Sequence, residues 1–163
     1  MGELALSTPA LLSDGHRLDE FSCGVASLDD WLKRRARQNQ SSGASRVYVV
    51  AAGDAVAGYY ALASGALALN EAPGSVRRNM PDPIPMAVLG RLAVDRAWMG
   101  KGLGAALLQD AVLRTVQAAS ILGIRGMIVH AISDEAKAFY ERHGFIASRA
   151  QPMALILSLK ARG

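Results

Sequence analysis

The sequence of 163 residues fits one domain that is large enough to bury a core without a metal or disulfide staple. It contains no apolar run near the roughly 20 residues of a membrane span, and residues 1–14 carry no basic residue to begin a signal peptide. We therefore expect a single domain over residues 1–163 in the cytoplasm, without a membrane partner. The net charge of +4 favours polyanionic partners only weakly. The lone Cys23 excludes an internal disulfide, argues against a metal site, and is interpreted as a buried apolar side chain.

The first predicted element is an amphipathic helix. Ser27 and Asp30 have the spacing of a helix-start capping signal, and the periodic pattern continues to about Asn39. Arg35 falls toward the apolar side of this helix, so it must snorkel or find a partner. The apolar stripe is Leu28, Trp31, Leu32 and Ala36, and the opposite, basic face is Lys33, Arg34 and Arg37.

A hairpin and a long loop are predicted next. Residues 46–52, rich in Val and Tyr, and residues 55–62 flank the tight-turn signal Gly53-Asp54, which predicts two antiparallel strands. Residues 70–83 contain several prolines, so we expect a long irregular loop, a kind of segment that is often functional. Arg77 and Arg78 lie in this loop.

The second half alternates strands and helices. Residues 84–94 are apolar apart from Arg91 and predict a buried strand, which a glycine-rich turn connects to a helix. Ser133 suits the start of a later helix and Gly144 suits its end. Further strands are expected at residues 124–131 and 153–160. This order predicts an α/β fold: a mixed sheet with an antiparallel N-terminal half, a parallel crossover, and helices on both faces.

The glycine-rich turn has the features of an anion-binding loop. Gly100, Gly102 and Gly104 stand at alternate positions, so the backbone N–H groups of the turn and the following helix end can all face one anion. Lys101 adds a cation. The alternative is a tight turn that uses glycine only for its backbone freedom. The spacing fits neither a Rossmann fingerprint nor a P-loop.

At this turn the sequence resembles the GNAT acetyltransferase family. Gly102 and Gly104 fill the small positions of the family motif [QR]-x-x-G-x-[GA], and Met99 stands where the family has Gln or Arg. A second motif, Ala136-x-x-Phe139-Tyr140-Glu141-x-x-Gly144-Phe145, supports the resemblance. The resemblance implies acetyl-CoA as co-substrate, no metal, and backbone pairing of residues 92–94 with the pantetheine arm. The expected cofactor-binding residues are Leu92, Ala93, Val94, Met99, Gly100, Lys101, Gly102, Leu103, Gly104, Ser133 and Phe139.

The resemblance also indicates a catalytic acid, Tyr140. A neutral amine attacks the thioester, and a phenol of pKa about 10 can protonate the expelled thiolate, whose pKa is about 8.5 by analogy with Cys. At pH 7 an α-amine is neutral at about 10% and a Lys amine at about 0.04%, so an enzyme without a strong base suits α-amines. No general base stands out, because the candidates qualify by residue type only: His130, Glu135, Glu141 and His143.

Two further segments resemble the GNAT toxins of bacterial toxin–antitoxin systems. They are Phe21-Ser22-Cys23-Gly24 with Leu28-Asp29-Asp30-Trp31-Leu32, and Leu89-Gly90-Arg91-Leu92-Ala93-Val94-Asp95. With the two motifs above, the likeness covers about residues 16–160. It implies acetylation of the α-amine of aminoacyl-tRNA, which blocks translation, and it implies a ribbon-helix-helix antitoxin and a homodimer. A tRNA backbone needs a basic surface, for which the candidates are Arg77, Arg78, Lys33, Arg34, Arg37 and Arg91.

Other interpretations stand beside this one. A GNAT enzyme can instead acetylate a small-molecule or protein N-terminal amine, and a non-catalytic RNA- or partner-binding module can use the same fold. Met99 favours the non-catalytic module, whereas Tyr140 opposes it. The basic residues of the first helix are equally typical of a solvated face. Arg91, in a buried strand, is expected to pair with an acid or to line the active site.

Overall fold

The computed structural model describes residues 5–159 and confirms the expected α/β fold. Seven strands form a sheet in the order β1-β2-β3-β4-β5-β7-β6. Pairing is antiparallel for β1–β2, β2–β3, β5–β7 and β6–β7, and parallel for β4–β5. The strands are β1 (Ala10–Leu11), β2 (Arg46–Ala52), β3 (Ala55–Leu67), β4 (Ile84–Val94), β5 (Gly126–His130), β6 (Ile146–Ala147) and β7 (Ala154–Ser158).

The chain divides into two compact units. The first comprises residues up to Leu62 together with Arg91–Ala111, and the second comprises Ala63–Gly90 together with the residues from Val112 on. Strands β3 and β4 and helix α4 (Leu103–Ala119) each contribute to both units. Each unit has its own buried apolar cluster, around Leu32 and Tyr59 in the first and around Met86 and Ile156 in the second.

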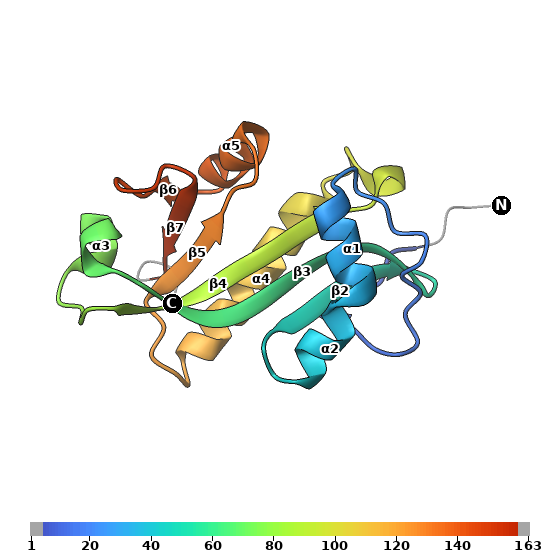
Figure 1. Cartoon of the computed structure of the whole chain (residues 1–163), viewed down its shortest axis with the longest axis horizontal. Helices are drawn as coiled ribbons and strands as arrows, with labels where there is room; N and C mark the ends of the chain where they lie inside the picture. Colours follow the sequence, from blue (N-terminus) through green and yellow to red (C-terminus); the bar gives the residue numbers. More distant parts are fainter. Residues whose placement is uncertain (1–4, 160–163) are drawn as a thin grey trace. The chain divides into compact units, whose positions relative to one another are not determined.

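In the first unit, helices pack on both faces of β3. Helices α1 (Ala26–Arg34) and α2 (Ala36–Ser41) lie over one face of β2 and β3 (Figure 1). Side chains alternate along a strand, so Tyr59 faces α1, where its ring stacks on Trp31 at a centroid distance of 6.1 Å, while Gly58 faces α4. A Cβ at Gly58 would lie only 2.8 Å from Leu107. Glycine at this position therefore lets α4 pack directly on β3.

The predicted helix start at Ser27 is wrong. The helix begins one residue earlier, with the extended Val25 as N-cap and no side-chain capping bond. Asp29 reaches back instead, and its Oδ1 accepts a hydrogen bond from the N–H of Cys23 at 2.9 Å. The carboxylate thus satisfies a donor in the segment that leads into the helix, where Ser27 makes no such bond.

The predicted single helix to Asn39 is also wrong, because it is interrupted at Arg35. The backbone there has φ −121° and ψ −27°, which ends α1 and begins α2. The N–H of Arg35 still donates to the carbonyl of Trp31 at 2.8 Å, and Asn39 donates to Arg35 at 2.8 Å, so the hydrogen-bonded path continues through the break. Both backbone groups of Arg35 therefore remain hydrogen-bonded at the interruption.

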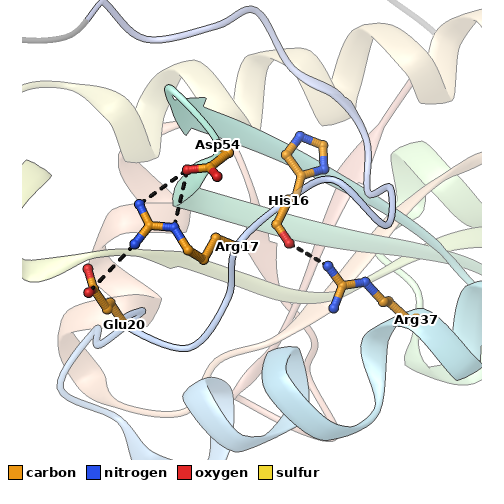
Figure 2. Close-up of polar contacts among 5 residues, drawn as sticks. All are labelled: His16, Arg17, Glu20, Arg37 and Asp54. Carbon is orange, nitrogen blue, oxygen red and sulfur yellow. Dashed lines mark hydrogen bonds and ion pairs between the residues drawn. The ribbon is translucent and has the colours of Figure 1, made fainter.

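The segment before α1 is tied to the hairpin and to α2 (Figure 2). Arg17 forms an ion pair with Asp54, at 3.1 Å, in the turn between β2 and β3. The Nη2 of Arg37 donates to the backbone oxygen of His16 at 2.5 Å. It also donates to that of Ser13 at 3.2 Å. Arg37 therefore holds the turn at residues 13–16 against α2.

In the second unit, the expectation of a wholly irregular loop at residues 70–83 is wrong. The segment includes the 3₁₀ helix η1 (Leu69–Glu71) and the short helix α3 (Gly74–Arg77). The Nε of Arg125 donates to the carbonyl of Val76 at 3.0 Å, and its Nη2 donates to that of Ser75 at 3.2 Å. Carbonyls at the C-terminal end of a helix have no donor within the helix. The Arg125 guanidinium, which comes from a segment far along the chain, supplies these donors and so stabilises α3.

The predicted ends of helix α5 (Asp134–Arg142) are confirmed. The Oγ of Ser133 accepts from the N–H of Ala136 at 3.0 Å, and Gly144 follows the helix with φ +92°. The short strand β6 was not predicted, and the expected end of the last strand at Lys160 lies outside the described residues. Within residues 5–159, no helix is both long enough and apolar enough to cross a membrane.

Candidate functional site

The C-terminal end of β4 has a backbone edge that β5 does not pair. The parallel register joins β4 to β5 from Met86 to Leu89. Strand β4 nevertheless continues to Val94, and the N–H of Asp95 donates to Ala57 of β3 at 2.8 Å. The backbone of residues 90–94 is therefore extended and can pair with an added strand or an extended ligand. This stretch contains residues 92–94, for which the resemblance to the GNAT family implies pairing with pantetheine.

The glycine-rich turn after β4 has a backbone geometry that favours glycine. Gly100 has φ +76° and Gly102 has φ +82°, while a Cβ on either would meet nothing within 4 Å. The requirement is therefore conformational rather than steric. Gly104 already lies inside α4, whose first bond runs from Ala106 N–H to Gly102 O at 3.1 Å. The N–H groups of residues 103–105 have no acceptor within the helix and are oriented to bind an anion.

The side chains of the turn are largely exposed. The Nζ of Lys101 lies 5.0 Å from the centroid of the Trp98 ring, a cation–π contact that keeps the ammonium beside the turn. Met99 is 47% exposed. It stands where the family pattern has Gln or Arg, so the groups of this turn that are able to contact an anion are the backbone N–H groups and the Lys101 ammonium. Leu103 is buried and anchors the start of α4.

Asp95 connects this turn to the segment before α1. Its carboxylate accepts from the N–H of Ser22 at 3.0 Å and from the N–H of Ala97 at 2.9 Å, and Arg96 N–H donates to the Ser22 carbonyl at 2.8 Å. Gly24 has φ +92°, and a Cβ there would lie 3.4 Å from the Arg96 guanidinium. The two segments that resemble the toxin subfamily are thus in direct contact.

The second unit holds the candidate acid, Tyr140, on α5. Its ring packs edge-to-face against Phe139 and Phe145 at centroid distances of 5.2 and 5.4 Å, and the residue is 6% exposed. This burial raises the pKa of Tyr140 to about 12. Within residues 5–159 the Tyr140 hydroxyl forms no hydrogen bond to the protein. Every fully buried side-chain oxygen in these residues does have a hydrogen-bond partner, so the Tyr140 hydroxyl is not fully buried. The hydroxyl therefore reaches the surface, where a ligand can contact it.

The residues considered as general bases lie in open surroundings. His130, Glu135, Glu141 and His143 are all exposed. The Nδ1 of His143 lies 2.8 Å from the carbonyl oxygen of Phe139, which fixes the ring at the end of α5. None of the four has the buried, charge-coupled setting typical of a general base.

The candidate RNA-binding residues differ in their surroundings. Four are exposed: Lys33, Arg34, Arg77 and Arg78. Arg37 is exposed as well, but its guanidinium is engaged by the carbonyls of the 13–16 turn. Arg91 is half-buried, and its Cζ lies 4.3 Å from the centroid of the Trp31 ring. The sequence led us to expect that Arg91 would pair with an acid or line the active site. In the structure its guanidinium lies over an aromatic ring.

Sequence reasoning missed a cavity of about 410 Å³ on α1 and α2. Its lining residues are Trp31, Arg35, Gln38, Asn39 and Ser42. The spacing 31-35-38-42 is that of one helix face, so the signal was present in the sequence. The sequence assigned Trp31 to the apolar stripe and left Arg35 to snorkel or to find a partner, and neither expectation points to a cavity.

Neither metal nor thiol chemistry is indicated in the described part of the chain. Residues 5–159 contain no group of three or more His, Cys, Asp or Glu side chains able to hold a metal. Cys23 is buried, its Sγ donates to the Val25 carbonyl at 3.6 Å, and burial raises its pKa to about 11. The thiol is therefore neutral at physiological pH, and its burial confirms the interpretation of Cys23 as a buried apolar side chain.

Comparison with known proteins identifies the family. Residues 43–147 match the Acetyltransferase (GNAT) domain. The chain is 50% identical over 154 residues to a tRNA-acetylating toxin of Mycobacterium tuberculosis (strain ATCC 25618 / H37Rv), covering 94% of this chain and 93% of the toxin. It is also similar to AtaT complexed with acetyl-methionyl-tRNAfMet, with 29% identity, a TM-score of 0.89 and 97% coverage of both chains.

A second AtaT structure is a tyrosine-to-phenylalanine variant bound to acetyl-CoA and to the C-terminus of the antitoxin AtaR. It is 28% identical, with a TM-score of 0.81 and coverage of 96% of this chain and 94% of that chain. With a domain match over more than half of the sequence and a relative at 50% identity, the chain belongs to the GNAT acetyltransferase family.

Proposed function

We propose that this protein is a toxin that transfers an acetyl group from acetyl-CoA to the α-amine of aminoacyl-tRNA and so blocks translation. The observation that carries the proposal is the 50% identity, over 94% of the chain, with a tRNA-acetylating toxin. The AtaT complexes with acetyl-methionyl-tRNAfMet and with acetyl-CoA support the same acceptor and donor. Acetylation removes the nucleophile that peptide-bond formation needs.

The acetyl donor fits the residues at the end of β4. Acetyl-CoA supplies the acetyl group as a thioester. The N–H groups of residues 103–105 and the Lys101 ammonium suit its pyrophosphate, and hydrogen bonds to charged oxygens contribute about 1.5–3 kcal/mol each. We assign the pantetheine arm to the extended backbone of Leu92, Ala93 and Val94. Met99, Gly100, Gly102, Leu103 and Gly104 shape the turn, and Ser133 and Phe139 are proposed as further contacts.

Tyr140 is proposed as the general acid. The amine nitrogen forms the new C–N bond, the C–S bond breaks with its electron pair on sulfur, and the Tyr140 hydroxyl gives its proton to that sulfur. The phenolate then regains a proton from water, and the new amide nitrogen releases its extra proton to water. Because the pKa of Tyr140 is about 12, the donor form is present throughout the physiological range. An N–H of residues 92–94 is proposed to bind the developing oxyanion.

The open surroundings of the candidate bases support an α-amine acceptor. His130, Glu135, Glu141 and His143 are exposed, so none is positioned by burial to deprotonate a lysine ammonium. An α-amine, with a pKa near 8, already supplies about 10% of the neutral nucleophile at pH 7. The proposed chemistry therefore needs a positioned proton donor for the leaving thiolate more than it needs a base.

The exposed cations are proposed to contact the tRNA backbone. Within residues 5–159, none of Lys33, Arg34, Arg77 and Arg78 forms an ion pair, so their charges are available to phosphate. Arg37 and Arg91 add positive charge, but their guanidinium groups already have partners in the first unit. We assign these two a supporting electrostatic role.

The same relatives suggest the partners. We propose that a ribbon-helix-helix antitoxin neutralises the protein. We also propose that the protein itself acts in the cytoplasm as a homodimer and that both of its units belong to one GNAT domain. The AtaT structure with the C-terminus of AtaR supports an antitoxin of some kind. Size measurement of the purified protein, alone and with its antitoxin, tests the dimer.

The decisive experiment incubates the purified protein with labelled acetyl-CoA and either a charged total tRNA pool or the same pool after deacylation. Label on the charged pool alone is the expected result, because only aminoacyl-tRNA carries the α-amine. Label on neither pool, with acetyl-CoA binding intact, would overturn the proposal and leave an acetyltransferase for a small-molecule or protein amine.

A further inference from the structure

We propose that the cavity on α1 and α2 binds a nucleotide of single-stranded RNA, namely the 3′ end of the tRNA acceptor. This inference rests on the proposed function and specifies its substrate contact. The cavity measures about 410 Å³, within the range of small-ligand sites, and it lies entirely in the first unit. Its lining residues are Trp31, Arg35, Gln38, Asn39 and Ser42.

The lining combines one cation with neutral hydrogen-bonding groups. Arg35 brings a guanidinium, and no acidic side chain lines the cavity. Gln38 and Asn39 bring carboxamides, which both donate and accept hydrogen bonds, as the edges of nucleobases do. The Oδ1 of Asn39 already accepts from the Ser45 hydroxyl at 2.5 Å, which leaves the amide N–H groups of Asn39 for a ligand. A phosphate and a base edge match this set.

The aromatic wall of the cavity is fixed in position. The Trp31 ring stacks on Tyr59 with an interplanar angle of 10°, and the Tyr59 hydroxyl donates to the Leu28 carbonyl at 2.7 Å. The Arg91 guanidinium lies over the same Trp31 ring, with its Cζ 4.3 Å from the centroid, and holds the ring in place as well. A rigid aromatic wall in a cavity that also holds the Arg35 guanidinium suits a planar base attached to a phosphate.

The location also suits the end of the acceptor strand. Arg91, which touches Trp31, is followed directly by Leu92, the first of the residues assigned to the pantetheine arm. In aminoacyl-tRNA the reacting α-amine belongs to an amino acid esterified to the terminal ribose. The terminal nucleotide must therefore bind next to the amino acid, because an ester bond joins the two. An inorganic anion or an acidic peptide would use Arg35 but leave the carboxamides and the Trp31 wall without partners.

A binding experiment tests the site directly. In a ¹⁵N-labelled full-length protein, the two indole N–H signals, assigned with Trp31→Phe, are followed while the trinucleotide CCA is added. The Trp31 signal is expected to shift and that of Trp98 to stay. Arg35→Gln should raise the apparent Kd for CCA about tenfold, because a tenfold change in Kd corresponds to the loss of about one hydrogen bond to a charged group. Arg46→Gln, which removes an exposed charge from the same unit outside the cavity, should leave the Kd within twofold.

Three outcomes would overturn the assignment. One is the absence of any Trp31 shift with CCA. Another is the same shift with inorganic phosphate alone, which would make the cavity a simple anion site. The third is the same shift with tetraglutamate, which would make it a site for acidic peptides.

A kinetic experiment separates this inference from the proposed function. If the wild-type protein acetylates charged tRNA, Arg35→Gln should raise KM for charged tRNA about tenfold while kcat stays within twofold, since Arg35 is assigned to binding and not to chemistry. Normal acetylation with an unchanged KM in Arg35→Gln sinks the cavity assignment alone. CCA binding at Trp31 without any acetylation of charged tRNA sinks the proposed function and leaves the cavity as an RNA site.

Discussion

The carboxylate of Asp95 accepts a hydrogen bond from the backbone N–H of Ser22 at 3.0 Å, and this contact joins the segment before α1 to the start of the glycine-rich turn. Asp95 starts the turn toward α4, and Ser22 belongs to the segment that leads into α1. The glycine-rich turn and the helix that carries the cavity are therefore positioned by one shared side chain. The same carboxylate also accepts from Ala97 N–H at 2.9 Å, so its removal affects both segments.

Asp95→Ala should destabilise the protein and weaken acetyl-CoA binding together. Two hydrogen bonds to a charged group are lost, so we expect the free energy of unfolding to fall by about 2–3 kcal/mol. Urea unfolding measures that loss, and calorimetry measures the Kd for acetyl-CoA. Asp30→Ala, at an exposed position on α1, is the control. A stability loss with an unchanged Kd would show that Asp95 does not position the turn.

Gly102→Ala should weaken acetyl-CoA binding more than its effect on stability explains. The residue has φ +82° with open space around it, so an added Cβ introduces backbone strain of about 1–2 kcal/mol rather than a clash. Gly43→Ala is a matched control, because Gly43 has φ +84° and equally open space but lies in the loop after α2. Both variants should lose similar stability in urea. Equal Kd values for acetyl-CoA would contradict the role of the turn.

Tyr140→Phe should lower kcat for charged tRNA by about 10²–10⁴-fold and keep the Kd for acetyl-CoA, because only the proton donor is removed. Tyr48→Phe, which removes a hydroxyl elsewhere in the fold, should retain activity. The raised pKa also predicts the pH profile. The donor form is lost only as pH rises toward about 12, while the neutral α-amine increases through pH 8, so the rate should rise from pH 6 to 9 without a descending limb. A fall in rate between pH 8 and 10 would contradict this assignment of the acid.

The sequence predicted the parts of the site that local chemistry specifies. Gly102 was identifiable because it alternates with Gly100 and Gly104 within one short turn. The Ser133 cap was identifiable because the N–H group that it accepts from lies only three residues further along the chain. The roles of Arg37 and Arg91 were not predictable, because their partners, His16 and Trp31, lie far away along the chain. The same holds for α3, whose carbonyls depend on Arg125, and for the bond from Ser22 to Asp95. Long-range contacts leave no periodic signal in a single sequence.

Changing both Arg77 and Arg78 to Ala should weaken tRNA binding most at low salt. Both side chains are exposed at the end of α3, and each neutralised phosphate contributes about 0.7–0.9 to the slope of log K against log salt. We therefore expect the slope to decrease by about 1.5 if both residues contact phosphate. Filter binding across a salt series measures it.

The control for this pair removes the same charge elsewhere: Arg46→Ala combined with Arg149→Ala, both exposed positions. If the control flattens the slope as much, the effect is one of net charge and not of contact. If neither double variant changes the slope, the backbone contacts must come from other cations, with Lys33 and Arg34 the next to change. The anchoring of α3 by Arg125 makes a direct contact the expected result, because a held segment loses less entropy when its side chains bind phosphate.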